Sequence, residues 1–132
     1  MKTYFRLLIA GIAVPVAAII LITAIATGYA FKLAFTVRSS PDQMQIARFA
    51  QTLGRTCWTP MQTLLTAAMS MFASRNAASH AWQYGTIVGV VVAMIEIVTV
   101  RQSSARLILD VALLVGAGWC GGLLTAWRAE HA

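Results

Sequence analysis

Two carboxylates lie inside apolar stretches of this chain, where a charged group is costly. Glu96 falls in the run 82–100 and Asp110 in the run 107–127, and the whole sequence has only four acidic residues. Ionisable groups within a membrane usually face protein or water and often mark the path of a proton or ion. One hypothesis is therefore a coupling site, at which this pair binds and releases a proton or a cation during transport.

The competing hypothesis is that basic neighbours neutralise both acids. Arg101 and Arg106 border the short turn between the two apolar runs, and Arg106 precedes Asp110 by four residues, the spacing of an intrahelical ion pair. We favour this structural role over transport. A third hypothesis is that Glu96 or Asp110 docks a basic residue of a partner subunit.

Small residues recur on the same helix faces as the two acids. The set comprises Gly85, Gly89 and Ala93 in the run 82–100, and Gly118, Gly121 and Gly122 in the run 107–127. Gly89 precedes Glu96 by seven residues, so both share one face of a helix, as do Asp110 and Gly121. Small residues at a spacing of four let membrane helices approach closely. We expect this packing to occur within the chain, with a dimer seam as the alternative.

No other group of residues in the sequence indicates chemistry. His80 and His131 have no ligand cluster nearby, and Cys57 and Cys120 show no metal or redox spacing. We find no phosphate-binding glycine loop and no pairing of a nucleophile with a base. We therefore expect no metal, no cofactor and no enzymatic activity.

The elements that position these residues are helices long enough to cross a bilayer, which takes about 20 mainly apolar residues. The runs 7–31, 82–100 and 107–127 meet this length. The run 57–75 is more polar, so it either crosses among protein neighbours or lies at the surface. We expect an all-α integral membrane protein with three or four transmembrane helices in a single membrane domain, 1–132. The short turn after residue 100 predicts an antiparallel hairpin of the last two runs.

The segment before the polar run has the pattern of a short amphipathic helix. Ser40, Pro41 and Asp42 form a helix start, with Ser40 as the cap. Apolar residues follow at helical spacing until Gly54. We predict an interfacial helix over about 41–54, with a connecting helix packed on the bundle as the alternative.

The composition fits a lipid environment. Hydrophobic residues make up 59% and charged residues 11% of the chain, against about 25% charged in soluble domains. The net charge of +6 comes from residues at the ends of apolar runs, which favours anionic headgroups as partners rather than nucleic acid. In a four-span arrangement the basic residues are nearly balanced between the two sides, so they do not decide the orientation.

We expect a non-enzymatic subunit of a membrane assembly in a bacterial inner (plasma) membrane. Its partners would be the lipid bilayer and other membrane proteins, or a second copy of the chain. The alternatives are a small homo-oligomeric transporter or channel that uses Glu96 and Asp110, and a holin-like pore former.

Overall fold

The computed structural model describes residues 2–37, 42–75, 78–99 and 105–131. Within these ranges the chain is all-helical, which confirms the all-α part of the prediction: α1 (Lys2–Val37), α2 (Gln43–Ser74), the 3₁₀ turn η1 (Ala78–His80), α3 (Ala81–Thr99) and α4 (Ala105–Glu130). In the part of the chain that the structure describes, three helices are long and apolar enough to cross a membrane: α1 over Thr3–Thr36, α3 and α4. Helix α2 does not meet that criterion over its own length.

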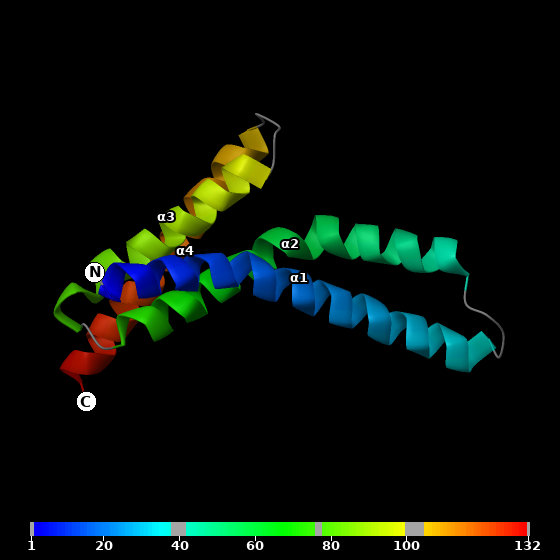
Figure 1. The fold of residues 1–132 in the computed structure, drawn as a ribbon, viewed down its shortest axis with the longest axis horizontal. Coiled ribbons are helices and arrows are strands. Elements are labelled where there is room, and N and C mark those ends of the chain that lie inside the picture. Colours follow the sequence, from blue (N-terminus) through cyan, green and yellow to red (C-terminus); the bar gives the residue numbers. More distant parts are fainter. Residues whose placement is uncertain (1, 38–41, 76–77, 100–104, 132) are drawn as a thin grey trace.

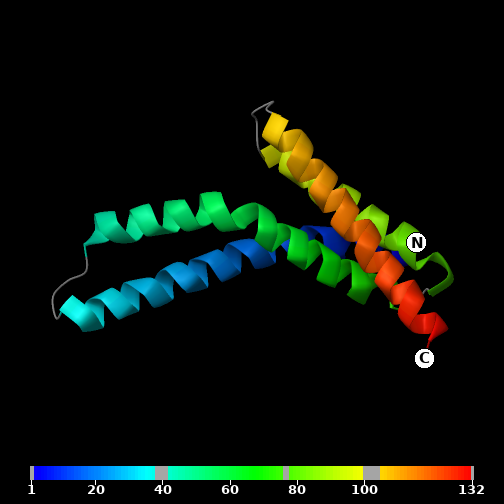
Figure 2. The same cartoon turned by 180° about the vertical axis from the view of Figure 1, so that it is seen from behind.

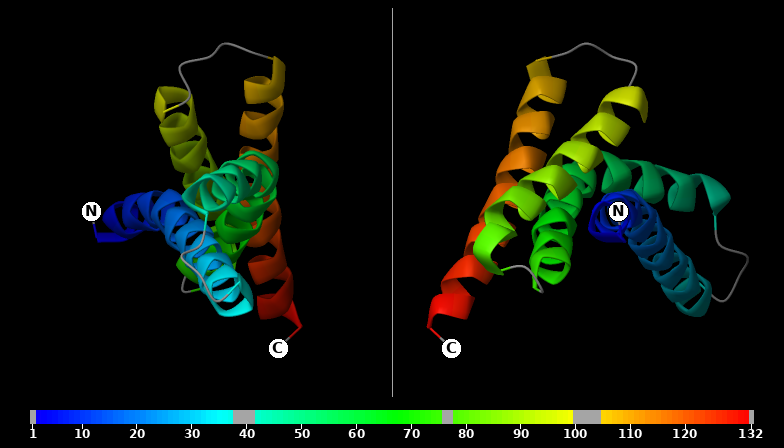
Figure 3. Two further views of the ribbon diagram at one scale, coloured as in Figure 1. Left: turned by 90° about the vertical axis from the view of Figure 1, so that its right-hand side faces the viewer. Right: turned by 60° about the vertical axis from the view of Figure 1, so that its left-hand side comes forward.

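The first half of α1, the second half of α2, and helices α3 and α4 pack together as a four-helix bundle (Figure 1). Leu7 of α1 packs with Val88 of α3, and further along both helices Val14 packs with Val92, so α1 and α3 run in the same direction. In both views of Figure 3, α3 and α4 lie side by side. Gly85 of α3 contacts Gly122, near the end of α4, so the antiparallel hairpin predicted for the last two runs is confirmed. Direction alternates along the chain, as in an up-down-up-down bundle.

Helix α2 is one continuous element of 32 residues, about 48 Å long. The predicted helix end at Gly54 and the separate helix from residue 57 are therefore wrong, because α2 continues through both Gly54 and Pro60. The cap is Asp42, whose Oδ1 accepts the Met44 N–H at 2.9 Å; Ser40 and Pro41 lie outside the described residues. Figure 2 shows α2 bending near its middle, as expected where a proline removes a helical hydrogen bond.

The second half of α1 and the first half of α2 leave the bundle together (Figures 1 and 2). We call this pair, residues 19–36 and 43–56, the arm. The rings of Tyr29 and Phe49 stack within it with centroids 3.9 Å apart, and the Gln45 amide donates to the Tyr29 hydroxyl at 3.5 Å. The arm has one polar and one apolar outer face: Arg48 and Arg55 are exposed on α2, and many large apolar side chains are exposed on α1.

Candidate functional site

Glu96 is buried in the bundle and is bonded to a residue of another helix. Its side chain is 5% exposed, and its Oε1 accepts a hydrogen bond from Trp58 Nε1 at 3.1 Å. The contact forms because α2 and α3 run antiparallel, which brings the middle of α2 beside the end of α3. The partners of Glu96 expected from the sequence are arginines close to it along the chain, so Trp58 was missed.

Trp58 begins a row of polar residues that recurs every four positions along α2. We call this row the polar stripe; it consists of Trp58, Gln62, Thr66, Ser70 and Ser74, of which the last four are buried. The Ser70 hydroxyl donates to the Gly85 carbonyl at 3.4 Å, and the Ser74 hydroxyl donates to the Thr125 hydroxyl at 3.2 Å. The stripe therefore joins α2 to both α3 and α4. It also accounts for the polar composition of α2, since these groups point toward protein rather than lipid.

The six predicted packing residues all lie at contacts between helices of this chain. A Cβ built on Gly85 would lie 2.9 Å from Gly122 Cα, and one on Gly89 would lie 3.3 Å from Gly118 Cα. The backbones of α3 and α4 are thus in direct contact. Gly121 instead faces α2, and Ala93 is buried in a cluster with residues of α1 and α4.

The structure does not form the ion pair expected at the start of α4. Arg106 Nη2 donates to the Arg55 carbonyl of α2 at 3.3 Å, and no salt bridge joins it to Asp110 in the described part of the chain. Asp110 is half-buried and shares no hydrogen bond with Glu96 among the described residues. Arg101 lies outside them. The contacts therefore do not unite the two acids in one site.

A second candidate site is a groove on the outer face of α1, within the arm. We call it the α1 groove; it has a volume of about 600 Å³ and is lined by Ile19, Ile20, Thr23, Ala24, Thr27, Gly28 and Phe31. The Thr23 and Thr27 hydroxyls donate to carbonyls one turn earlier at 2.8 Å, so they add little polarity to its surface. A Cβ on Gly28 would meet no atom within 4 Å. The groove is therefore open and mainly apolar.

Within the described ranges, no group of three His, Cys, Asp or Glu side chains is placed to hold a metal ion. Comparisons with protein-family models, with curated proteins and with solved structures found no match for this chain. The function must accordingly be argued from the two sites above.

Proposed function

We propose that this chain is a non-enzymatic subunit of a membrane assembly, in the inner (plasma) membrane of a bacterium. In this proposal the α1 groove receives an apolar, membrane-embedded helix of a partner protein. The observation that carries it is the α1 groove itself. Small residues between Ile20 and Phe31 leave a depression along a helix that is long and apolar enough to span a bilayer.

Small residues already allow close contact between helices inside this chain. Where α3 meets α4, Gly85 and Gly89 allow backbone contact. The α1 groove also has small residues at a spacing of four, Ala24 and Gly28, but lies on the arm, outside the bundle. A helix of another chain would gain there the close packing that drives association in lipid.

We further infer that the second half of α2 is a fourth crossing. Both chain ends lie toward the same end of the molecule (Figure 1), which calls for an even number of crossings. The main objection to a crossing here is the polar composition of α2, but Gln62, Thr66 and Ser70 are buried against protein and would not meet lipid. In the arm, the polar face of α2 then lies toward the headgroups and the α1 groove lies toward the acyl chains.

The test is affinity purification in mild detergent with a matched pair of variants. Gly28→Leu fills the α1 groove, while Gly116→Leu adds the same side chain to α4; a Cβ at either position would meet no atom within 4 Å. We expect the native chain and Gly116→Leu to retain a stoichiometric partner and Gly28→Leu to lose it.

Recovery of the native chain as a lone monodisperse monomer would count against the proposal, as would equal retention by both variants. If a second copy of the chain is the partner lost in Gly28→Leu, the assembly is a homo-oligomer.

A small transporter or channel is the second candidate, favoured by the burial of Glu96. In that case Glu96→Gln would abolish flux in liposomes while leaving the fold intact. We rank it second because Glu96 is bonded to Trp58, and Asp110, its proposed partner, is not joined to it. A holin-like pore former would instead collapse the membrane potential on expression.

A further inference from the structure

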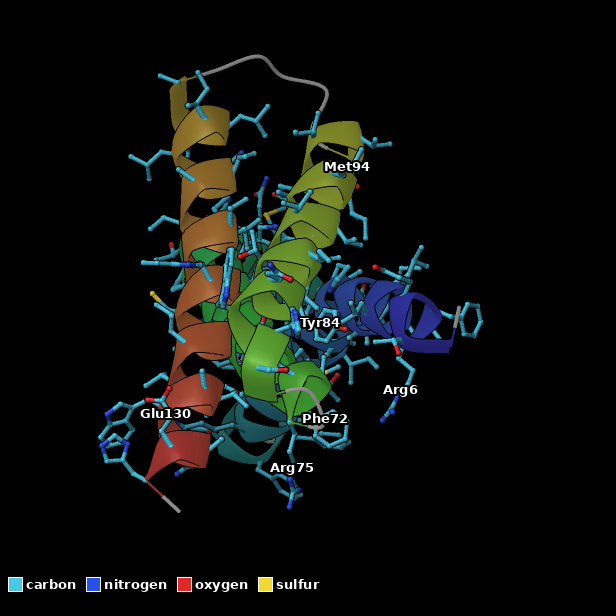
Figure 4. The ribbon with its side chains drawn as sticks, turned by 90° about the vertical axis from the view of Figure 1, so that its left-hand side faces the viewer. Arg6, Phe72, Arg75, Tyr84, Met94 and Glu130 are labelled. Atoms are coloured by element: carbon cyan, nitrogen blue, oxygen red, sulfur yellow. The ribbon has the colours of Figure 1, made fainter. Side chains whose placement is uncertain are left out.

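A groove with two arginines lies between the last turns of α2 and α4. We call it the arginine groove; it has a volume of about 660 Å³ and is lined by Ala68, Met71, Phe72, Arg75, Thr125, Arg128 and Ala129. Arg75 and Arg128 are both exposed and follow directly on apolar helical segments. Figure 4 shows Phe72 and Arg75 together at the end of α2. The groove therefore has two cations at the boundary of the bundle, above an apolar floor.

The floor continues away from the arginines along the outer face of α2. Leu64, Ala68 and Phe72 recur every four residues there, and all three are exposed. Leu124 lies one turn before Arg128 and is also exposed. This arrangement matches the shape of a phospholipid, with the phosphate beside the guanidinium groups and an acyl chain along the apolar stripe.

The charges at this end favour a ligand with net negative charge. The guanidinium groups of Arg75 and Arg128 form no salt bridge with a described residue, and Figure 4 shows Glu130 on the side of α4 away from Arg75. The Thr125 hydroxyl is already bonded to the Gly121 carbonyl at 3.1 Å, so the arginines are the available donors. Guanidinium groups bind phosphate oxygens in a bidentate manner.

We propose that the arginine groove is a binding site for an anionic phospholipid, with its phosphate held between Arg75 and Arg128 and an acyl chain packed along Ala68 and Phe72. A zwitterionic lipid brings its own cation near the two arginines and is bound more weakly.

The experiment measures lipid binding to the full chain in non-ionic detergent, by native mass spectrometry during titration with phosphatidylglycerol. In the double variant Arg75→Gln/Arg128→Gln we expect an affinity about 25-fold lower, because each of the two basic residues near the surface contributes roughly fivefold. The matched control Arg48→Gln/Arg55→Gln removes the same charge from the arm and should change the affinity by less than about twofold. Both pairs of side chains are exposed, so all variants should fold, which circular dichroism checks.

A third variant, Ala68→Trp, separates a lipid from a free phosphate. It fills the apolar floor without changing the charge, so it should weaken phosphatidylglycerol binding and leave the binding of inorganic phosphate unchanged. The proposal is overturned if phosphatidylcholine binds as tightly as phosphatidylglycerol, or if the control pair weakens binding as much as the groove pair. It is also overturned if inorganic phosphate displaces the lipid at an equal concentration, because a free ion is then the occupant.

Discussion

At the scale of single residues, the sequence identified the buried acid but not its partner. Glu96 was expected to face protein because a carboxylate in an apolar run is costly, and the structure buries it. The expected partners were arginines close in sequence, whereas the bond comes from Trp58, 38 positions away. Such a contact depends on how α2 and α3 pack, which no local pattern encodes. The spacing of four in the polar stripe was the one sequence signal that this face of α2 packs against other helices.

We expect Trp58→Phe to lower the free energy of unfolding by about 1–3 kcal/mol, because it leaves a buried carboxylate without its donor. The measurement is equilibrium unfolding in mixed micelles, followed by circular dichroism. Trp127→Phe, at an exposed position near the end of α4, should stay within about 0.5 kcal/mol of the native value.

A double-mutant cycle with Glu96→Met isolates the interaction itself. Trp58→Phe should lower the free energy of unfolding by less in the Glu96→Met background, because no buried carboxylate then loses its hydrogen-bond donor. An equal cost in both backgrounds would show that the bond between Trp58 and Glu96 contributes nothing to stability.

At the scale of elements, hydropathy located α1, α3 and α4, but local signals divided α2 wrongly. Gly54 is typical of a helix end, and the sequence therefore predicts a helix over about 41–54 separate from the run 57–75, whereas Gly54 and Pro60 both lie inside α2. A glycine inside a helix costs only about 1 kcal/mol relative to alanine, which packing can outweigh. Ile46, Phe49 and Leu53 are partly buried, and Phe49 stacks on α1. Tertiary contact along the arm thus keeps α2 continuous.

This continuity predicts the sign of a substitution at Gly54. We expect Gly54→Ala to raise the free energy of unfolding by roughly 0.5–1 kcal/mol, because alanine stabilises a helix interior and its Cβ would meet no atom within 4 Å. The same unfolding experiment on Gly121→Ala should give a loss of about 1–3 kcal/mol, since that Cβ would lie 2.5 Å from the Ala67 carbonyl oxygen. A loss of stability in Gly54→Ala would instead place a helix end at this residue.

At the scale of the whole molecule, composition predicted a helical membrane protein and the short turn predicted the hairpin of α3 and α4. The arm was not predicted, because α1 and α2 each extend beyond the bundle only when the other covers them. Two segments treated separately in sequence, 19–36 and 43–56, become one unit through the contact between Tyr29 and Phe49. That unit gives the molecule its extended shape (Figure 2). The α1 groove lies on its outer face.

The proposed four crossings have a direct test in the labelling of single cysteines. In a background with Cys57 and Cys120 replaced by alanine, cysteine is introduced singly for Asp42, Ser79, Ala105 or Glu130, and an impermeant maleimide is applied to sealed, oriented vesicles. If α2 crosses, Ser79→Cys and Glu130→Cys react from one side, and Asp42→Cys and Ala105→Cys from the other.

Asp42→Cys and Ser79→Cys, at the two ends of α2, decide whether α2 crosses the membrane, because a crossing α2 puts them on opposite sides and a surface α2 puts them on the same side. If α2 stays at the surface, Asp42→Cys, Ser79→Cys and Glu130→Cys all react from one side and Ala105→Cys alone from the other. That pattern would leave the second half of α2 beside α3 and α4 without crossing. The bond from Trp58 to Glu96 and the bond from Ser70 to Gly85 would then need a tilted α3, since they join α2 to positions 11 residues apart on that helix, about 16 Å. A crossing α2 satisfies both bonds with the helices antiparallel.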